Sequence, residues 1–250
     1  MIAPRQACAA LAGLALAVVA LPALAADAPF LLARASRGAF RLAGERSAAP
    51  ILVDESDHPG VRRAARDLAE DVSRVTSLRP DVVSGERAAP DVVVVGTIGR
   101  SRAVDRLVAA GRLDVTDVRG RWEASVTQVV AKPWPGVERA LVIAGSDPRG
   151  TIFGLYDVSE RIGVSPWYWW ADVPVRRSER LLVARGRWVR REPAVKYRGI
   201  FINDEAPALS GWAREKFGGF NSKFYAHVFE LLLRLRANFL WPAMWGSAIA

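Results

Sequence analysis

The stretch Lys196-Tyr-Arg-Gly-Ile-Phe-Ile-Asn-Asp-Glu205 decides the fold of this chain. Its centre, residues 199–202, is short, β-branched and aromatic, which is typical of a buried strand. The strand ends abruptly in the amide of Asn203 and the carboxyls of Asp204 and Glu205. Because barrel enzymes carry their active sites at the carboxyl ends of their strands, the stretch predicts a barrel strand with a functional site at its end.

A helix and a second strand follow. Apolar residues spaced three and four apart predict a helix over residues 222–238, with Asn221 as its N-cap. Residues 239–241, Phe-Leu-Trp, begin the next strand. A strand-helix-strand unit of this kind is typical of a (β/α)8 barrel, which needs about 250 residues, so residues 193–250 are predicted as its first, incomplete segment.

The preceding part alternates strands and helices and predicts a small mixed-sheet α/β domain over residues 26–190. The glycine-rich turns at residues 96–99 and 145–150 match neither phosphate-binding pattern, so we interpret them as tight turns. Residues 187–193 are polar and end in proline, which indicates a connector. In order, we expect a strand over residues 51–53, a helix over 61–76, a strand over 91–95, a helix over 101–110 that Gly111 ends, a hairpin of 122–130 with 140–144, and a helix over 151–162.

Four consecutive aromatic residues, 167–170, precede the predicted connector. Such a run suits either a platform on which sugars stack or packing between two domains. Because aromatic side chains dominate buried interfaces, interdomain packing is the favoured interpretation.

Residues 1–25 have the pattern of a secretory signal peptide. Arg5 precedes an uncharged apolar stretch, and the triplet Ala23-Leu24-Ala25 predicts cleavage near Ala25 or Ala26. A retained membrane anchor is the alternative, but the stretch is short of the roughly 20 residues that a span needs. The only cysteine, Cys8, lies in this segment. We therefore expect a bacterial periplasmic or secreted protein without disulfides, and with no membrane association after cleavage.

The formal charge of +9 comes mainly from arginine, since only four of the 35 basic residues are lysines. No basic run is interleaved with aromatics, so nucleic acid is not the expected partner, whereas an anionic substrate is. The two histidines, His58 and His227, are isolated and have no cysteine cluster beside them. The sequence therefore predicts no metal and no cofactor.

Four segments carry specific patterns: residues 140–160, which contain Gly145-Ser-Asp-Pro-Arg-Gly150; 163–174, which contain Pro166-Trp-Tyr-Trp-Trp170; 197–205; and 238–245, Asn-Phe-Leu-Trp-Pro-Ala-Met-Trp. Together these segments resemble glycoside hydrolase family 115, and the resemblance covers nearly all of the chain after residue 26. It implies an exo-acting α-glucuronidase that removes glucuronic acid, or its 4-O-methyl ether, from xylan by inversion. It also implies a (β/α)8 barrel after the α/β domain, and an acidic polysaccharide partner, glucuronoxylan or its oligosaccharides.

Under this resemblance, Asp204 and Glu205 have supporting catalytic roles. An inverting glycosidase holds its acid and base ~6.5–9.5 Å apart, and adjacent strand residues point to opposite faces, so these two are not the pair. The main acid and base are expected beyond Ala250. The alternative for both carboxyls is a structural ion pair with Arg198 or Arg214.

Three further residues are candidates for binding the sugar. Asn203 is expected to hydrogen-bond hydroxyls, and Trp241 and Trp245 are expected to face a pyranose ring, with core packing as the alternative. Trp212, placed in the loop after the first barrel strand, is a weaker candidate.

Two other function classes stay open. One is a non-catalytic carbohydrate-binding or scaffold module, should the natural chain end near Ala250. The other is a related exo-glycosidase of the hexosaminidase kind. Residues 1–250 alone are expected to be inactive, and residues 193–250 alone poorly ordered or aggregation-prone, because their last strand exposes an unpaired edge. The sequence leaves homo-oligomerisation open.

Overall fold

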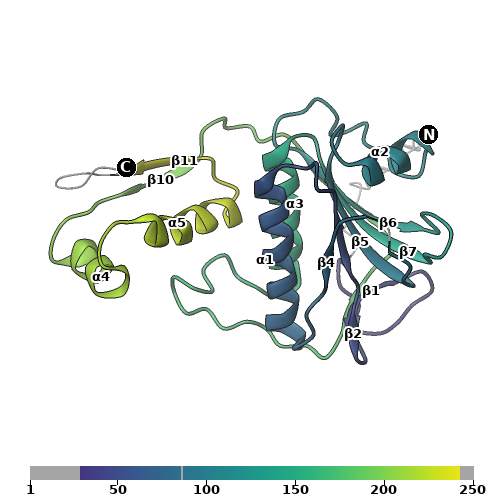
Figure 1. Cartoon of the computed structure of the whole chain (residues 1–250), viewed down its shortest axis with the longest axis horizontal. Coiled ribbons are helices and arrows are strands. Elements are labelled where there is room, and N and C mark those ends of the chain that lie inside the picture. Colours follow the sequence, from purple (N-terminus) through teal and green to yellow (C-terminus); the bar gives the residue numbers. More distant parts are fainter. Residues whose placement is uncertain (1–28, 86, 243–250) are drawn as a thin grey trace, which may run out of the picture.

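The computed structural model describes residues 29–85 and 87–242. The predicted signal peptide with Cys8, and the candidate Trp245, lie outside the described residues. Figure 1 shows a sheet covered by helices, the N-terminal unit (residues 29–190), beside a smaller group of helices and strands, the C-terminal segment (residues 193–242).

A six-stranded mixed sheet forms the centre of the N-terminal unit, which confirms the predicted α/β class. Strands β4, β3, β5 and β7 run parallel, and β6 and β9 each run antiparallel to their neighbours. Both faces of β5 are covered, which explains its continuous valine run. In sheet order the strands are β4 (Val82–Val83), β3 (Ile51–Val53), β5 (Asp91–Thr97), β7 (Arg139–Gly145), β6 (Ser125–Ala131) and β9 (Arg187–Arg190).

Helices α1 (Pro59–Thr76) and α3 (Pro148–Arg161) cover one face of this sheet, and α2 (Arg102–Ala109) covers the other. The alternation along β5 divides the core accordingly: Val93 and Val95 pack with α1 and α3, whereas Val92 and Val94 pack with α2. A three-stranded antiparallel sheet closes one end of the unit, formed by β2 (Ser47–Ala48), β1 (Phe40–Gly44) and β8 (Leu181–Val183).

The glycine-rich turn before α3 is a tight turn, as predicted. The Asp147 carboxylate accepts the Gly150 N–H at 2.7 Å and so caps α3. A Cβ atom at Gly150 would lie 2.3 Å from the Ala124 carbonyl oxygen, so only glycine lets the helix start this close to β6.

The C-terminal segment has the predicted β-α-β form. Strands β10 (Gly199–Ile202) and β11 (Phe239–Pro242) pair in parallel and lie against α5 (Ser222–Arg234), whose first turn is capped by the Asn221 side chain. The predicted helix over residues 222–238 is too long: α5 ends at Arg234, and Arg236 takes a left-handed backbone at φ +60°. This turn directs the chain into β11.

Two expectations for the loops are wrong. Residues 187–190, expected in the connector, form β9, because Trp188 and Arg190 pair with Thr127 and Ser125 of β6. Trp212, expected in a loop, lies on α4 (Ala208–Phe217) and is half-buried among aromatic rings.

The aromatic run at residues 167–170 joins the two parts of the chain, which confirms the interdomain interpretation. The Trp169 ring stacks on His227 with centroids 3.9 Å apart, and the Trp170 ring lies 5.7 Å from that of Trp212. The Trp170 indole N–H also donates to the His227 carbonyl oxygen at 3.2 Å. Such pairs add about 0.5–1.5 kcal/mol each beyond the burial of their area.

Candidate active-site strand ends

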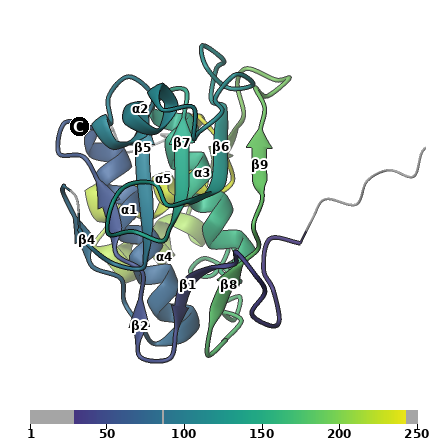
Figure 2. The ribbon, with the colours of Figure 1, turned by 90° about the vertical axis from the view of Figure 1, so that its right-hand side faces the viewer.

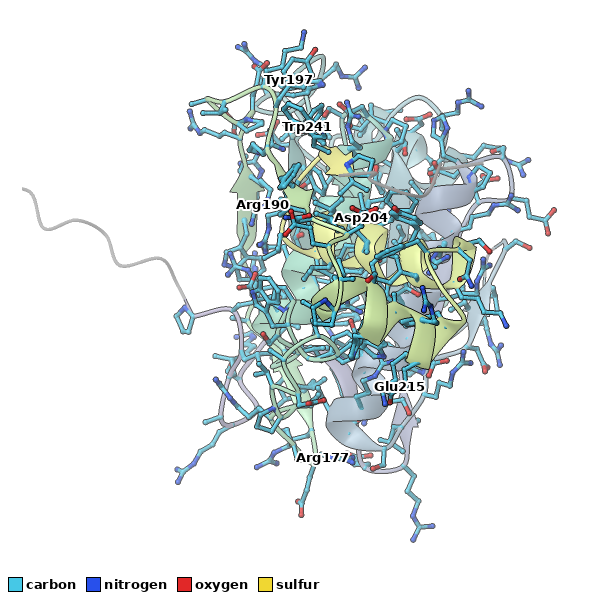
Figure 3. All side chains as sticks on the ribbon, turned by 90° about the vertical axis from the view of Figure 1, so that its left-hand side faces the viewer. Arg177, Arg190, Tyr197, Asp204, Glu215 and Trp241 are labelled. Carbon is cyan, nitrogen blue, oxygen red and sulfur yellow. The ribbon has the colours of Figure 1, made fainter. Side chains whose placement is uncertain are left out.

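Polar side chains emerge where β10 ends. The strand stops at Ile202, so Asn203, Asp204 and Glu205 lie immediately beyond its carboxyl end, as the sequence predicts. Because Ile202 pairs with Pro242 in parallel register, the end of β11 lies at the same edge. Figure 3 shows Asp204 and Trp241 on this side of the molecule.

The two adjacent carboxyls have different surroundings. Asp204 is 8% exposed, whereas Asn203 and Glu205 are exposed. The Glu205 N–H donates to the Asn203 side-chain oxygen at 3.3 Å. Burial, followed by the charge of Asp204, raises the pKa of the Tyr225 phenol, so the buried carboxylate lies near α5. Only Glu205 of the two carboxyls is freely open to solvent.

One face of the β10–β11 pair is a surface of exposed aromatic rings. Phe201 and Trp241 face each other at 6.0 Å, and Tyr197 and Phe239 at 6.3 Å. Trp241 is 63% exposed, so it does not belong to the core that the described residues form. We call these four rings the aromatic face; α5 packs on the opposite side of the two strands.

Arg198 does not form the alternative ion pair with Asp204 or Glu205. The Arg198 guanidinium pairs with the carboxylate of Glu123, in the N-terminal unit. Glu123 has a fully buried side chain, binds Arg149 Nε at 2.7 Å, and accepts from Asn238 Nδ2 at 2.9 Å. Sequence reasoning missed Glu123, because its partners Arg198 and Asn238 lie far from it along the chain.

Asp71 is a second carboxylate that holds the C-terminal segment. The Arg234 guanidinium donates to both of its oxygens, at 2.8 and 3.2 Å, and both side chains are buried. The guanidinium also lies over the rings of Tyr156 and Tyr168, at 4.7 and 4.8 Å. Burial lowers the pKa of Arg234, but Asp71 outweighs it, so the net pKa is raised and the arginine stays charged.

Asp157, on α3, is the third carboxylate that holds the C-terminal segment. It accepts from Arg161 at 2.7 Å, from Arg236 at 3.1 Å and from Arg190. Burial raises the pKa of Asp157, but the charges of Arg190 and Arg161 outweigh it, so the net pKa is lowered. We call the largely buried Glu123, Asp71 and Asp157 the three anchor carboxylates, because each binds an arginine of the C-terminal segment; the more exposed Glu160 also binds Arg236.

Two further properties concern residues 29–85 and 87–242 only. This part of the chain contains no group of three or more His, Cys, Asp or Glu side chains arranged to hold a metal ion. None of its helices is both long and apolar enough to cross a membrane.

The site can therefore supply hydrogen bonds, one buried carboxylate, one open carboxylate and rings for stacking.

The sequence model of glycosyl hydrolase family 115 matches residues 190–250, which include these strand ends. A solved structure, a family GH115 4-O-methyl-α-glucuronidase with specificity for decorated arabinogalactans, matches with a TM-score of 0.68 and 33% identity over 82% of this chain. The chain belongs to glycosyl hydrolase family 115.

The chain covers only 26% of that family GH115 enzyme, about a quarter of its length. A β-hexosaminidase of Streptomyces plicatus also matches, with a TM-score of 0.49 and 13% identity, over 82% of this chain and 31% of the enzyme; a likeness this weak says nothing about activity. A search of curated protein sequences found no match.

Proposed function

We propose that the protein to which this chain belongs is an exo-acting, inverting α-glucuronidase that removes glucuronic acid, or its 4-O-methyl ether, from xylan. The observation that supports this most is the placement of Asn203, Asp204 and Glu205 at the carboxyl end of β10, next to the exposed Trp241, in a member of family 115. The strand pair would be the start of a (β/α)8 barrel, whose active site lies at that end.

Each residue has a role in this proposal. The buried Asp204 orients the uronic acid by accepting from its hydroxyls, and Glu205, which is open to solvent, assists a catalytic group. Asn203 donates to the sugar, and Trp241, together with Trp245, packs on the ring. The acid and base are residues other than this adjacent pair, since their ~6.5–9.5 Å separation needs residues from different strands.

The test compares Asp204→Asn and Glu205→Gln in the intact protein, with release of glucuronic acid from glucuronoxylan as the readout. We expect kcat/KM to fall about 100-fold or more in each, because each variant keeps the shape and loses the charge. Glu215→Gln is the control, since Glu215 is on α4 with a 72% exposed side chain and pairs only locally with Lys216 in the described part. Near-wild-type rates in both variants, with unchanged unfolding midpoints, would contradict the proposal.

The identity of the polymer substrate has to be tested separately from the α-glucuronidase activity. The similar enzyme is specific for decorated arabinogalactans, so glucuronoxylan and a glucuronate-decorated arabinogalactan should be assayed side by side. If glucuronic acid were released from the arabinogalactan alone, the proposed polymer would be wrong, but the proposed α-glucuronidase activity would stand. Cleavage of N-acetylhexosaminides alone would favour the hexosaminidase alternative, and binding without hydrolysis would favour a module.

Export is part of the proposal. Cleavage near Ala25 or Ala26 would deliver the enzyme to the periplasm or the medium, where the polymer or its oligosaccharides are found. N-terminal sequencing of the mature protein tests this, and a mature protein that retains residue 1 would contradict it.

A further inference from the structure

A cavity of about 340 Å³ lies where α3 faces the sheet edge formed by β6 and β9. Figure 2 shows β9 at this edge beside β6. The cavity is lined by residues of the N-terminal unit and by Arg191, which follows β9, and takes no residue from β10 or β11. Its polar lining consists of Ser125, Thr127, Asp157, Arg161, Arg190 and Arg191.

Two buried hydroxyl residues line this cavity. Ser125 is 2% exposed and Thr127 is 5% exposed, and the structure shows no hydrogen bond to either side-chain hydroxyl within the described part of the chain. The β6–β9 register places Ser125 opposite Arg190 and Thr127 opposite Trp188, so these side chains share one face of the sheet. Both residues line the cavity and their hydroxyls have no bond within the described part of the chain to give up, so both are available to an occupant.

The lining also has more cations than anions. Asp157 is its one carboxylate, and Arg161, Arg190 and Arg236 already donate to it. The Nε atom of Arg190 is buried and has no hydrogen-bond partner. Arg191 adds a third guanidinium to the lining. The unused groups are therefore donors and positive charges, which suit an oxyanion.

We propose that this cavity binds a small oxyanion, a carboxylate or a phosphate. Arg190 Nε and the Thr127 and Ser125 hydroxyls donate to the bound oxygens, and Arg191 supplies charge. The half-buried Trp188 provides an apolar wall, which favours the carboxylate of an acidic monosaccharide over a bare ion. The proposal does not depend on the strand ends of β10 and β11.

Isothermal titration of the intact protein with sodium glucuronate, glucose and sodium phosphate tests it. We expect glucuronate to bind and glucose not to bind. Thr127→Val keeps the side-chain shape and removes the donor, so it should weaken glucuronate binding about 10-fold while its unfolding midpoint stays at or above that of the wild type, because the hydroxyl has no bond to lose. Arg191→Gln should weaken binding by a similar factor.

Two control variants distinguish binding in this cavity from binding elsewhere on the protein. Arg119→Gln removes the same charge from an exposed arginine outside the cavity and should leave binding unchanged. Trp241→Ala alters the aromatic face, where the proposed function places the sugar, so it should weaken only binding at the strand ends and keep the binding that Thr127→Val loses. Phosphate binding as tight as glucuronate binding would support a general oxyanion site, and glucuronate binding alone an acidic-sugar site. No binding of either anion, or wild-type binding in both Thr127→Val and Arg191→Gln, would overturn the proposal.

Discussion

Glu123 connects more of the molecule than any residue at the strand ends. Its backbone is left-handed at φ +51°, a conformation uncommon outside glycine, and its N–H donates to Asp147 Oδ2 at 2.7 Å. Its carboxylate receives Arg198, just before β10, and Asn238, just before β11. A single buried carboxylate therefore sets where both strands begin.

Glu123→Gln should destabilise the folded chain by about 3 kcal/mol, because it leaves two guanidinium groups without a charge partner in a buried site. The measurement is the free energy of unfolding in urea. Glu192→Gln is the matched control: Glu192 is 45% exposed in a 4.0 Å pair with Arg121, and its loss should change the free energy by less than about 0.5 kcal/mol. Equal effects of the two substitutions would refute the role of Glu123.

Among individual residues, the sequence identified those whose role can be inferred from their immediate neighbours in the chain. Asn203, Asp204 and Glu205 could be placed because a strand pattern ends directly before them. Glu123 could not be, since its partners lie 75 and 115 residues away along the chain. A carboxyl whose partners are this distant looks like any surface acid in the sequence.

The elements with strong periodicity were predicted, and the short ones were not. The helices α1, α2, α3 and α5 and the strands β3, β5, β6, β7, β10 and β11 follow from their apolar patterns, whereas α4 was missed. The missed strands β1, β2, β4, β8 and β9 have at most five residues, and β1 and β8 pair although more than 130 residues separate them. Their identity depends on a partner, which a local pattern does not contain.

A substitution at Gly199 tests whether the close approach of β10 and β11 contributes to stability. A Cβ atom there would lie 1.9 Å from the Phe239 carbonyl oxygen, so Gly199→Ala should push the strands apart and lower the free energy of unfolding by about 2–3 kcal/mol. Gly211→Ala, on α4 with open space around it, should instead raise the free energy by up to about 1 kcal/mol. Hydrogen exchange of β11 amides should increase only in Gly199→Ala, and unchanged exchange there would contradict the prediction.

Arginine ion pairs, as well as contacts between aromatic rings, connect the N-terminal unit to the C-terminal segment. The three anchor carboxylates, Asp71, Glu123 and Asp157, bind Arg234, Arg198 and Arg236 of the C-terminal segment. These contacts use the planar fork of N–H donors in guanidinium, a geometry that the lysine ammonium group does not have. Part of the arginine excess therefore has a structural use.

This interface should weaken in acid. The pKa of Asp157 lies below its ordinary 3.8, so its contribution to stability is complete above that value and is lost as the pH falls below it. Asp54 acts in the same direction: burial raises its pKa, but hydrogen bonds from Ser56 and Arg102 bring the pKa to about 2. We expect the thermal unfolding midpoint to fall progressively from about pH 5 to about pH 2, with most of the loss in the lower part of this range.

Two variants check the assignment. Asp157→Asn should show a weaker decline of the unfolding midpoint over this range, because its ionisable group is gone. The pKa of Asp67 is raised by burial, so protonation favours its folded state, and Asp67→Asn should steepen the decline. The same slope in wild type and both variants would show that other groups control the acid response.

The three anchor carboxylates also limit how relatives of this protein can be recombined. A chimera that joins the N-terminal unit of one homologue to the catalytic part of another would cut between each carboxylate and its arginine. Crossovers that leave the three pairs mismatched would bury charges without counter-ions, and those that transfer both members of each pair together would keep the junction intact. Compatible parents for domain shuffling can therefore be chosen by reading six positions, 71, 123, 157, 198, 234 and 236.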